Sequence, residues 1–201
     1  EVKLGLKRKG TDEIVEVGVI RAEIEIPVVE HKMLDDSIGY VWLRSFNKQA
    51  DSKLRAALED LKTKGMRGLV FDLSIDGGGL LDMAVAVSSM FVKDGPVVFV
   101  QERGAAPQPL NATGAQLIPD DIPMVVLVDR GSASASEIVA GCLQDRGRAA
   151  VVGQNTFGKS KVQTVAELND KSALILSTAV YLTPKKRDIS LEYEEGKRGV
   201  K

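Results

Sequence analysis

The stretch "PMVVLVDRGSASASEIVAGCLQDRG", residues 123–147, combines the pattern of a buried strand with the pattern of a helix. Residues 123–129 form an apolar run like that of a strand buried on both faces. Ser134 or Ser136 can cap the helix that follows, and Gly147 can end it. Small residues fill the corner between the two elements, which would leave a serine hydroxyl exposed beside helix-start amides. The stretch therefore predicts a strand–turn–helix unit.

The flanking sequence continues the alternation of strands and helices. A helical stripe is formed by Leu54, Ala57, Leu58 and Leu61, and Gly65 is a suitable stop. The glycines at 77–79 lead into another helical pattern. Residues 27–36 resemble a domain boundary, and residues 102–121 resemble a surface loop. Strands are predicted at 38–46, 68–73, 96–101, 123–129 and 149–153, with two N-terminal strands within 1–26 and a hairpin over 161–182. Together these patterns predict an α/β fold with a largely parallel sheet.

Composition narrows the possible functions. The chain has 201 residues, 44% apolar and 27% charged, which is the profile of a folded soluble domain. Its net charge of −1 argues against nucleic acid and anionic membrane surfaces as partners. With one cysteine and one histidine, the sequence predicts no metal site, no cofactor and no internal disulfide. Cys142 is expected to be a small core residue, and a Ser-His-Asp triad would have to be built on His31.

Residues 153–160, "GQNTFGKS", fit the phosphate-binding pattern G-x-x-x-x-G-K-[ST]. In nucleotide hydrolases that loop must open a helix, so that amides and the helix dipole face the anion. The residues that follow, 161–168, alternate and are rich in β-branched side chains, which favours a strand. Nucleotide binding is therefore the weaker interpretation, and Lys159 needs another role.

A serine nucleophile offers that role. A serine hydroxyl needs a base, and lysine is the usual substitute where histidine is scarce. We expect Lys159, beside Phe157 and Val162, to be buried, because burial favours the uncharged amine that accepts a proton. The glycines at 77–79 offer bare amides to an oxyanion. The alternative is structural: a serine-rich helix cap and a glycine turn.

Three segments together resemble the carboxyl-terminal processing proteases, also called tail-specific proteases. The similar segments are "GLVFDLSIDGGGLLDMAV" (68–85), residues 123–165 and "ALILSTAVYLTP" (173–184), in the family's order and spacing. The family comprises serine endopeptidases with a Ser/Lys dyad on a crotonase-like (ClpP-like) core. The resemblance implies a mostly parallel sheet with flanking helices as a peptidase core over 27–201. Residues 1–26 would be the last strands of a PDZ domain.

The resemblance also implies roles for particular residues. The nucleophile would be Ser134 and the general base Lys159, which Gln163 would orient. The oxyanion donors would be the backbone amides of Ala135 and Gly79, with Gly78 as the alternative.

Two acidic positions, Glu137 and Asp145, match residues that tune activity in relatives. The helical pattern by itself makes both of them ordinary helix-face charges.

The chain departs from the family pattern at three places. Ser160 replaces a glycine beside the predicted base, where its side chain is expected to affect strand geometry or rate. Residues 74–76, "SID", replace an Arg-x-Asn sequence before the glycines. Only the end of the PDZ domain is recognisable in 1–26. Because the family uses that domain to recruit tails and to gate the site, we expect cleavage by this chain to be either ungated or poorly recruited.

The function implied is a serine endopeptidase that cleaves proteins near their C-terminal tails through an acyl-enzyme. Its substrates would be unfolded or extended tails, with no nucleic acid, nucleotide or integral membrane segment involved. The location implied is extracytoplasmic, in a periplasm, cell envelope or equivalent lumen. The first alternative is a noncatalytic peptide-binding relative on the same fold. An acyl-CoA enzyme of the crotonase type and a nucleotide hydrolase are further alternatives.

Overall fold

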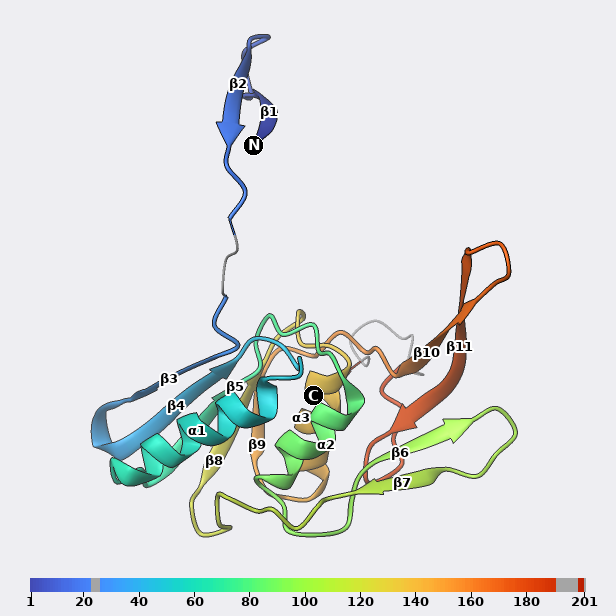
Figure 1. Ribbon diagram of the computed structural model, residues 1–201. Coiled ribbons are helices and arrows are strands. Elements are labelled where there is room, and N and C mark those ends of the chain that lie inside the picture. The colour runs from blue at the N-terminus through green and yellow to red at the C-terminus, as the bar shows by residue number, and fades with distance from the viewer. Residues whose placement is uncertain (23–25, 191–198, 201) are drawn as a thin grey trace.

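The computed structural model describes residues 1–22, 26–190 and 199–200 (Figure 1). Its central element is a five-stranded sheet in the order β3-β4-β5-β8-β9. These strands are β3 (Val29–Met33), β4 (Ile38–Leu43), β5 (Gly68–Asp72), β8 (Met124–Val128) and β9 (Ala150–Gly153). Neighbours from β4 to β9 are parallel, and β3 is antiparallel to β4. The predicted α/β fold with a mostly parallel sheet is thus confirmed for this sheet.

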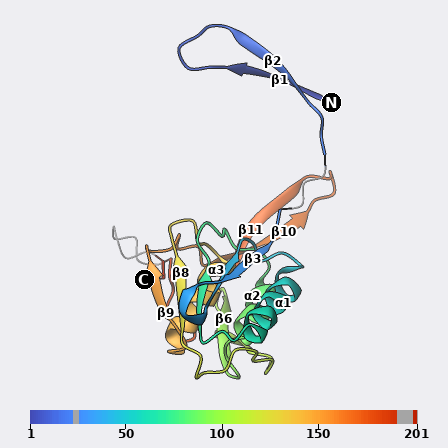
Figure 2. The same ribbon diagram turned by 90° about the vertical axis from the view of Figure 1, so that its left-hand side faces the viewer.

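Three helices lie on one side of the five-stranded sheet (Figures 1 and 2). They are α1 (Ala50–Thr63), α2 (Leu81–Ser89) and α3 (Ala135–Asp145), and a short 3-10 turn, η1, covers Asp35–Ser37. Helix α1 buries the predicted apolar stripe, and it ends just before Gly65. Helix α3 ends just before Gly147, as predicted. The helices cover the sheet with a core in which the rings of Phe71 and Phe91 lie 5.2 Å apart.

A second sheet is four-stranded and antiparallel, in the order β10-β11-β6-β7. Its strands are β6 (Pro96–Glu102), β7 (Gln108–Asn111), β10 (Lys161–Glu167) and β11 (Ala173–Leu182). Strands β10 and β11 form the predicted hairpin, whose tip projects from the molecule (Figure 1). Strand β10 lies at the edge of the sheet, so in the described part of the chain one side of its backbone has no neighbouring strand.

Two strands lie where the sequence indicated a boundary and a loop. Strand β3 falls within 27–36, and β7 falls within 102–121. Both are edge strands with mostly exposed side chains, so they lack the apolar pattern of a buried strand. Pro109 in β7 fits an edge position, because proline has no N–H to give to a ladder.

The N-terminal strands β1 (Val2–Lys7) and β2 (Ile14–Val19) form an antiparallel hairpin in which every residue is exposed. In both views the hairpin lies away from the two larger sheets (Figures 1 and 2). Residues 23–25, beside the predicted domain boundary, lie outside the described residues. The assignment of 1–26 to the end of a PDZ domain therefore stays a prediction.

Two loops meet where the parallel strands β5 and β8 end. The Asp129 carboxylate accepts a hydrogen bond from the Ile75 amide at 2.9 Å. The Ser132 hydroxyl donates to the Leu73 carbonyl at 2.8 Å, and the Ala133 amide donates to the Asp76 carbonyl at 3.0 Å. These bonds hold the glycine loop that follows β5 against the serine-rich turn that begins α3.

In the described part of the chain, no helix is both long and apolar enough to cross a membrane.

Candidate active site

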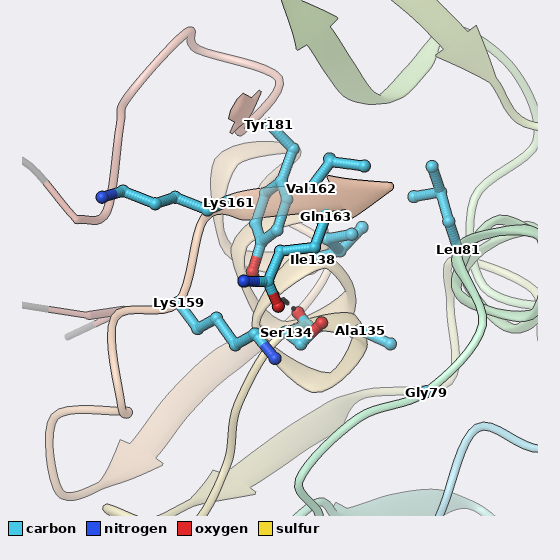
Figure 3. Close-up of a pocket in the computed structure, with 10 residues that line it drawn as sticks. All are labelled: Gly79, Leu81, Ser134, Ala135, Ile138, Lys159, Lys161, Val162, Gln163 and Tyr181. Carbon is cyan, nitrogen blue, oxygen red and sulfur yellow. Dashed lines mark hydrogen bonds between the residues drawn. The ribbon is translucent and has the colours of Figure 1, made fainter. Parts of the chain in front are cut away.

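A pocket of about 290 Å³ lies at the N-terminal end of α3 (Figure 3). Its lining residues are Gly79, Leu81, Ser134, Ala135, Ile138, Lys159, Lys161, Val162, Gln163 and Tyr181. Five of the predicted site residues therefore come together here: Ser134, Lys159, Gln163, Ala135 and Gly79. Three others, Gly78, Glu137 and Asp145, are not among the lining residues.

Ser134 is the residue immediately before α3, and its backbone is strained. Its φ of 58° and ψ of −114° lie in a region that non-glycine residues rarely adopt. Such strain persists only where surrounding contacts enforce it, and it is often found at functional sites. The Ser134 amide donates to the Glu137 carboxylate at 2.8 Å, and the Tyr181 hydroxyl donates to the Ser134 carbonyl at 3.2 Å. Tyr181 carried no recognisable signal in the sequence, because it lies at the buried end of an ordinary strand.

Glu137 connects the two segments that carry Ser134 and Lys159. Its carboxylate is fully buried and accepts four hydrogen bonds. Oε2 accepts from the amides of Ser134 at 2.8 Å and Lys159 at 2.9 Å. Oε1 accepts from the Thr156 hydroxyl and the Gly158 amide, both at 2.5 Å. The residue thus fixes the turn before α3 and the loop before β10 relative to each other.

The interpretation of Glu137 as an ordinary helix-face charge is therefore wrong. Burial raises the pKa of its carboxyl above the ordinary value, although the hydrogen bonds from Thr156, Lys159, Gly158 and Ser134 oppose that rise. The helical periodicity could not reveal this role, because three of the four donors come from residues 19 to 22 positions along the chain.

Asp145 lies at the other end of α3 and is also more than a helix-face charge. Its carboxylate pairs with the Arg187 guanidinium at 2.5 Å and accepts from the Lys185 amide at 2.9 Å. The side chain is only 3% exposed. Asp145 therefore anchors the segment that follows β11 to α3, and it does so outside the pocket.

Lys159 and Gln163 form the exposed wall of the pocket. The Lys159 amine end points toward Ser134, with the Gln163 amide close by (Figure 3). In the described structure no hydrogen bond joins Ser134 Oγ to Lys159 Nζ. The strand register shifts between Val162 and Gln163, and such irregularities re-aim side chains. The expectation that Lys159 would be buried is wrong, because Lys159 is exposed and the neighbouring Phe157 is 51% exposed.

The glycine loop faces the pocket through Gly79. A Cβ on Gly78 would lie 2.5 Å from the Ala133 carbonyl oxygen and 2.9 Å from Ser134 Cβ, and the φ of Gly78 is +92°. Both the close approach and the backbone conformation therefore require glycine there. The Gly78 amide donates to the Asp76 carboxylate at 2.8 Å. By contrast, no acceptor for the amides of Gly79 and Ala135 is found in the described residues, so both can donate to an anion in the pocket.

Ser160 faces away from the pocket. Its hydroxyl is bonded to Asp188 at 2.8 Å and to Ser190 at 2.7 Å. The side chain therefore anchors the segment beyond β11. After Ser160 the chain enters strand β10, as its β-branched residues predicted, so the loop at 153–160 does not open a helix.

The remaining candidates do not belong to the pocket. His31 lies on β3, where its Nε2 is 3.0 Å from the Asp60 carboxylate, and it does not line the site. Cys142 is fully buried in the core, as expected. Over the residues that the structure describes, no cluster of histidine, cysteine, aspartate or glutamate side chains could hold a metal ion.

Known proteins resemble this chain in sequence and in fold. A carboxy-terminal-processing protease of Bartonella bacilliformis is 39% identical over 91% of this chain, a match that covers 43% of the relative. The carboxy-terminal processing protease CtpA of Bacillus subtilis is 33% identical over 91% of this chain and 39% of its own length. The chain thus spans less than half the length of these relatives.

The solved structure of a photosystem II D1 C-terminal processing protease has a TM-score of 0.75 and 33% identity to this chain. The likeness covers 87% of this chain and 48% of that protein. Residues 37–196, most of the chain, match the sequence profile of peptidase family S41. The chain therefore belongs to peptidase family S41.

Proposed function

We propose that this chain is the core of a serine endopeptidase that cleaves proteins near their C-terminal tails. The observation that carries the proposal is the composition of one pocket in a member of peptidase family S41. A serine on a strained turn, a lysine amine that points toward it and two amides free to donate all line that pocket. The names of the related proteins, which describe carboxyl-terminal processing, support the same choice.

The proposed reaction begins with uncharged Lys159, which takes the proton of the Ser134 hydroxyl. Ser134 Oγ then bonds to the carbonyl carbon of the peptide, and the oxyanion accepts hydrogen bonds from the amides of Ala135 and Gly79. The C–N bond breaks as Lys159 returns the proton to the leaving amine. A water molecule that Lys159 deprotonates then hydrolyses the acyl-enzyme. Gln163 lies beside the lysine amine and would orient it.

Because Lys159 is exposed in the free protein, burial there cannot favour its uncharged form. We propose that the substrate supplies the cover, because a peptide in the pocket would exclude water from Lys159 and disfavour its charged form. Cleavage requires the uncharged amine, which the covered pocket would favour.

The edge position of β10 supports a mode of substrate binding. Lys161, Val162 and Gln163 on this strand line the pocket, and among the described residues no strand pairs with the outer side of β10. An extended tail could add to that edge through main-chain hydrogen bonds, which make little demand on side-chain sequence. This mode fits unfolded or extended tails as substrates.

The decisive experiment compares the digestion of casein and of an extended tail peptide by the wild-type chain and by Ser134→Ala, with products read by mass spectrometry. Wild type should release fragments, and Ser134→Ala should release none while it keeps the wild-type circular dichroism spectrum. The matched control is Ser177→Ala, a change to an exposed serine on β11, which should leave cleavage unchanged. Binding of the tail peptide without cleavage by wild type would instead favour the noncatalytic relative.

A further inference from the structure

Asp76 is a buried acid in the glycine loop that the proposed reaction does not use. Its side chain is fully buried, and its Oδ1 accepts the Gly78 amide at 2.8 Å. Its Oδ2 is also buried, and in the described part of the chain this oxygen has no hydrogen-bond partner. A carboxylate oxygen in this position is costly, whereas a protonated acid carries no charge to bury.

The backbone of Asp76 is also fixed in place by hydrogen bonds. Its carbonyl oxygen accepts from the Ala133 amide at 3.0 Å and from the Ser136 hydroxyl at 2.8 Å. Gly78, two residues on, packs against the backbone of Ala133 and Ala135 so closely that a Cβ would collide with both. Asp76 therefore lies close to the amides of Gly79 and Ala135. It cannot move away from them without breaking the packing against the turn before α3.

No neighbouring charge compensates an ionised Asp76. The charged or titratable groups on the elements packed around this loop are Arg44 and Lys48 beside Phe46, Asp72 on β5, Asp82 on α2, Asp129 and Arg130 after β8, Glu137 on α3, and Lys159. Within the described residues, none of them makes an ion pair or a hydrogen bond with the Asp76 carboxyl. Burial raises the pKa of Asp76 to about 7, and the hydrogen bond from the Gly78 amide offsets only part of that rise.

We propose that Asp76 is a positioning residue of the oxyanion site, which supports cleavage when it is protonated and slows cleavage when it loses that proton to solvent. The inference rests on the proposed function. The physical reason is repulsion in a poorly solvated place: an ionised Asp76 opposes the negative charge that develops on the substrate oxygen. The same ionisation draws the Gly78 amide toward the carboxylate, and so biases the loop that presents Gly79. Cleavage should therefore reach an alkaline limit that Lys159 alone would not impose.

The test is the pH dependence of kcat/KM for a fluorogenic tail peptide, measured for wild type and for Asp76→Asn. Asparagine keeps the acceptor for Gly78 and mimics the neutral acid at every pH. The ratio of variant to wild type should be about one near pH 5 and rise to roughly tenfold near pH 9. The midpoint of that rise should lie near 7. Because the two proteins share every other group that titrates, a flat ratio, or one that falls with pH, overturns the proposal.

The matched control is Asp82→Asn, which removes an exposed acid just beyond the same loop, and its ratio to wild type should stay near one at every pH. A second measurement does not need turnover. In the Ser134→Ala chain, the NMR shift of the Gly78 amide should titrate with a midpoint near 7, and Asp76→Asn should remove that titration. Titration near the ordinary value of an aspartate overturns the Asp76 proposal whatever the kinetics show. Cleavage that survives Ser134→Ala overturns the proposed function instead.

Discussion

The two walls of the pocket differ in burial and in the kind of residue that they contribute. One wall consists of the turn before α3 and the loop before β10, tied together by the fully buried Glu137. The other wall consists of the exposed side chain of Lys159 and the exposed strand β10, which begins two residues later and continues into a hairpin whose tip is solvated on both faces. Glu137 holds four donors, whereas the side chain of Gln163 is bonded to none of the described residues.

This difference suggests a division between geometry and chemistry. Substitutions in the buried wall should cost folding free energy, because they leave buried donors without an acceptor. Substitutions in the exposed wall should cost reaction rate but little stability, because exposed side chains lose few contacts.

The largest expected effect is on rate and comes from the exposed wall. Lys159→Ala should lower kcat/KM for a tail peptide by about 10²–10⁴-fold, because the proposed reaction loses its base. The thermal midpoint should stay within a few degrees of that of wild type, since the side chain is exposed. The control is Lys161→Ala, whose amine points away from Ser134 (Figure 3) and which should keep most of the activity. Equal losses in the two variants would contradict the role given to Lys159.

The next effect is on stability and comes from the buried wall. Glu137→Gln should lower the free energy of unfolding in urea by at least about 3 kcal/mol, because an amide cannot accept the four hydrogen bonds that the carboxylate accepts. Cleavage should fall with it, since the backbones of Ser134 and Lys159 lose their common partner. Glu167→Gln at the exposed end of β10 serves as the control, with no measurable shift expected. If Glu137→Gln unfolds at the wild-type urea concentration, the buried wall does not depend on this carboxylate.

The buried acid of the glycine loop should make stability depend on pH. The pKa of Asp76 is raised from 3.8 to about 7, so the folded chain binds a proton there that the unfolded chain has lost. Between these values stability should therefore fall as pH rises, and Asp76→Asn should remove that part of the fall. Above pH 7, the variant should be more stable than wild type by on the order of 4 kcal/mol, and near pH 3 the two should be alike. Urea titrations at a series of pH values measure this, and a constant difference between the two proteins would refute it.

The smallest expected effect lies at the tip of the exposed hairpin. Val165 is 61% exposed, so Val165→Thr should change the free energy of unfolding by less than about 0.5 kcal/mol. The same substitution at the fully buried Val126 on β8 should cost about 1–3 kcal/mol, because it places a hydroxyl in the core. Similar losses at the two positions would show that the hairpin tip is more tightly packed than its exposure indicates.

Most of the elements could be predicted because their patterns are local. The stripe of α1, the buried strands β5 and β8 and the β10–β11 hairpin each carry a full period of apolar residues within a few positions. Strands β3 and β7 could not be found in this way. They are short, and they lie at sheet edges where the partner strand supplies the pairing, so their own side chains carry little apolar signal.

For the candidate site, too, the sequence indicated some features and only the structure revealed others. Residue types indicated a serine nucleophile in the turn before α3, Lys159 as its base and glycine amides for an oxyanion, and the family resemblance selected Ser134 among the serines of that turn. The sequence did not reveal the burial or the hydrogen-bond partners of these side chains. The exposure of Lys159, the four bonds of Glu137 and the uncompensated burial of Asp76 each depend on segments that are distant in sequence.

Local periodicity and residue chemistry were sufficient to predict an α/β core and to indicate candidate reactive side chains, because both depend on a few consecutive positions. Desolvation and hydrogen-bond partners arise only when remote parts of the chain pack together. Long-range packing alone therefore made Glu137 the link between the turn before α3 and the loop before β10, left Lys159 in contact with water and buried Asp76 against the turn before α3.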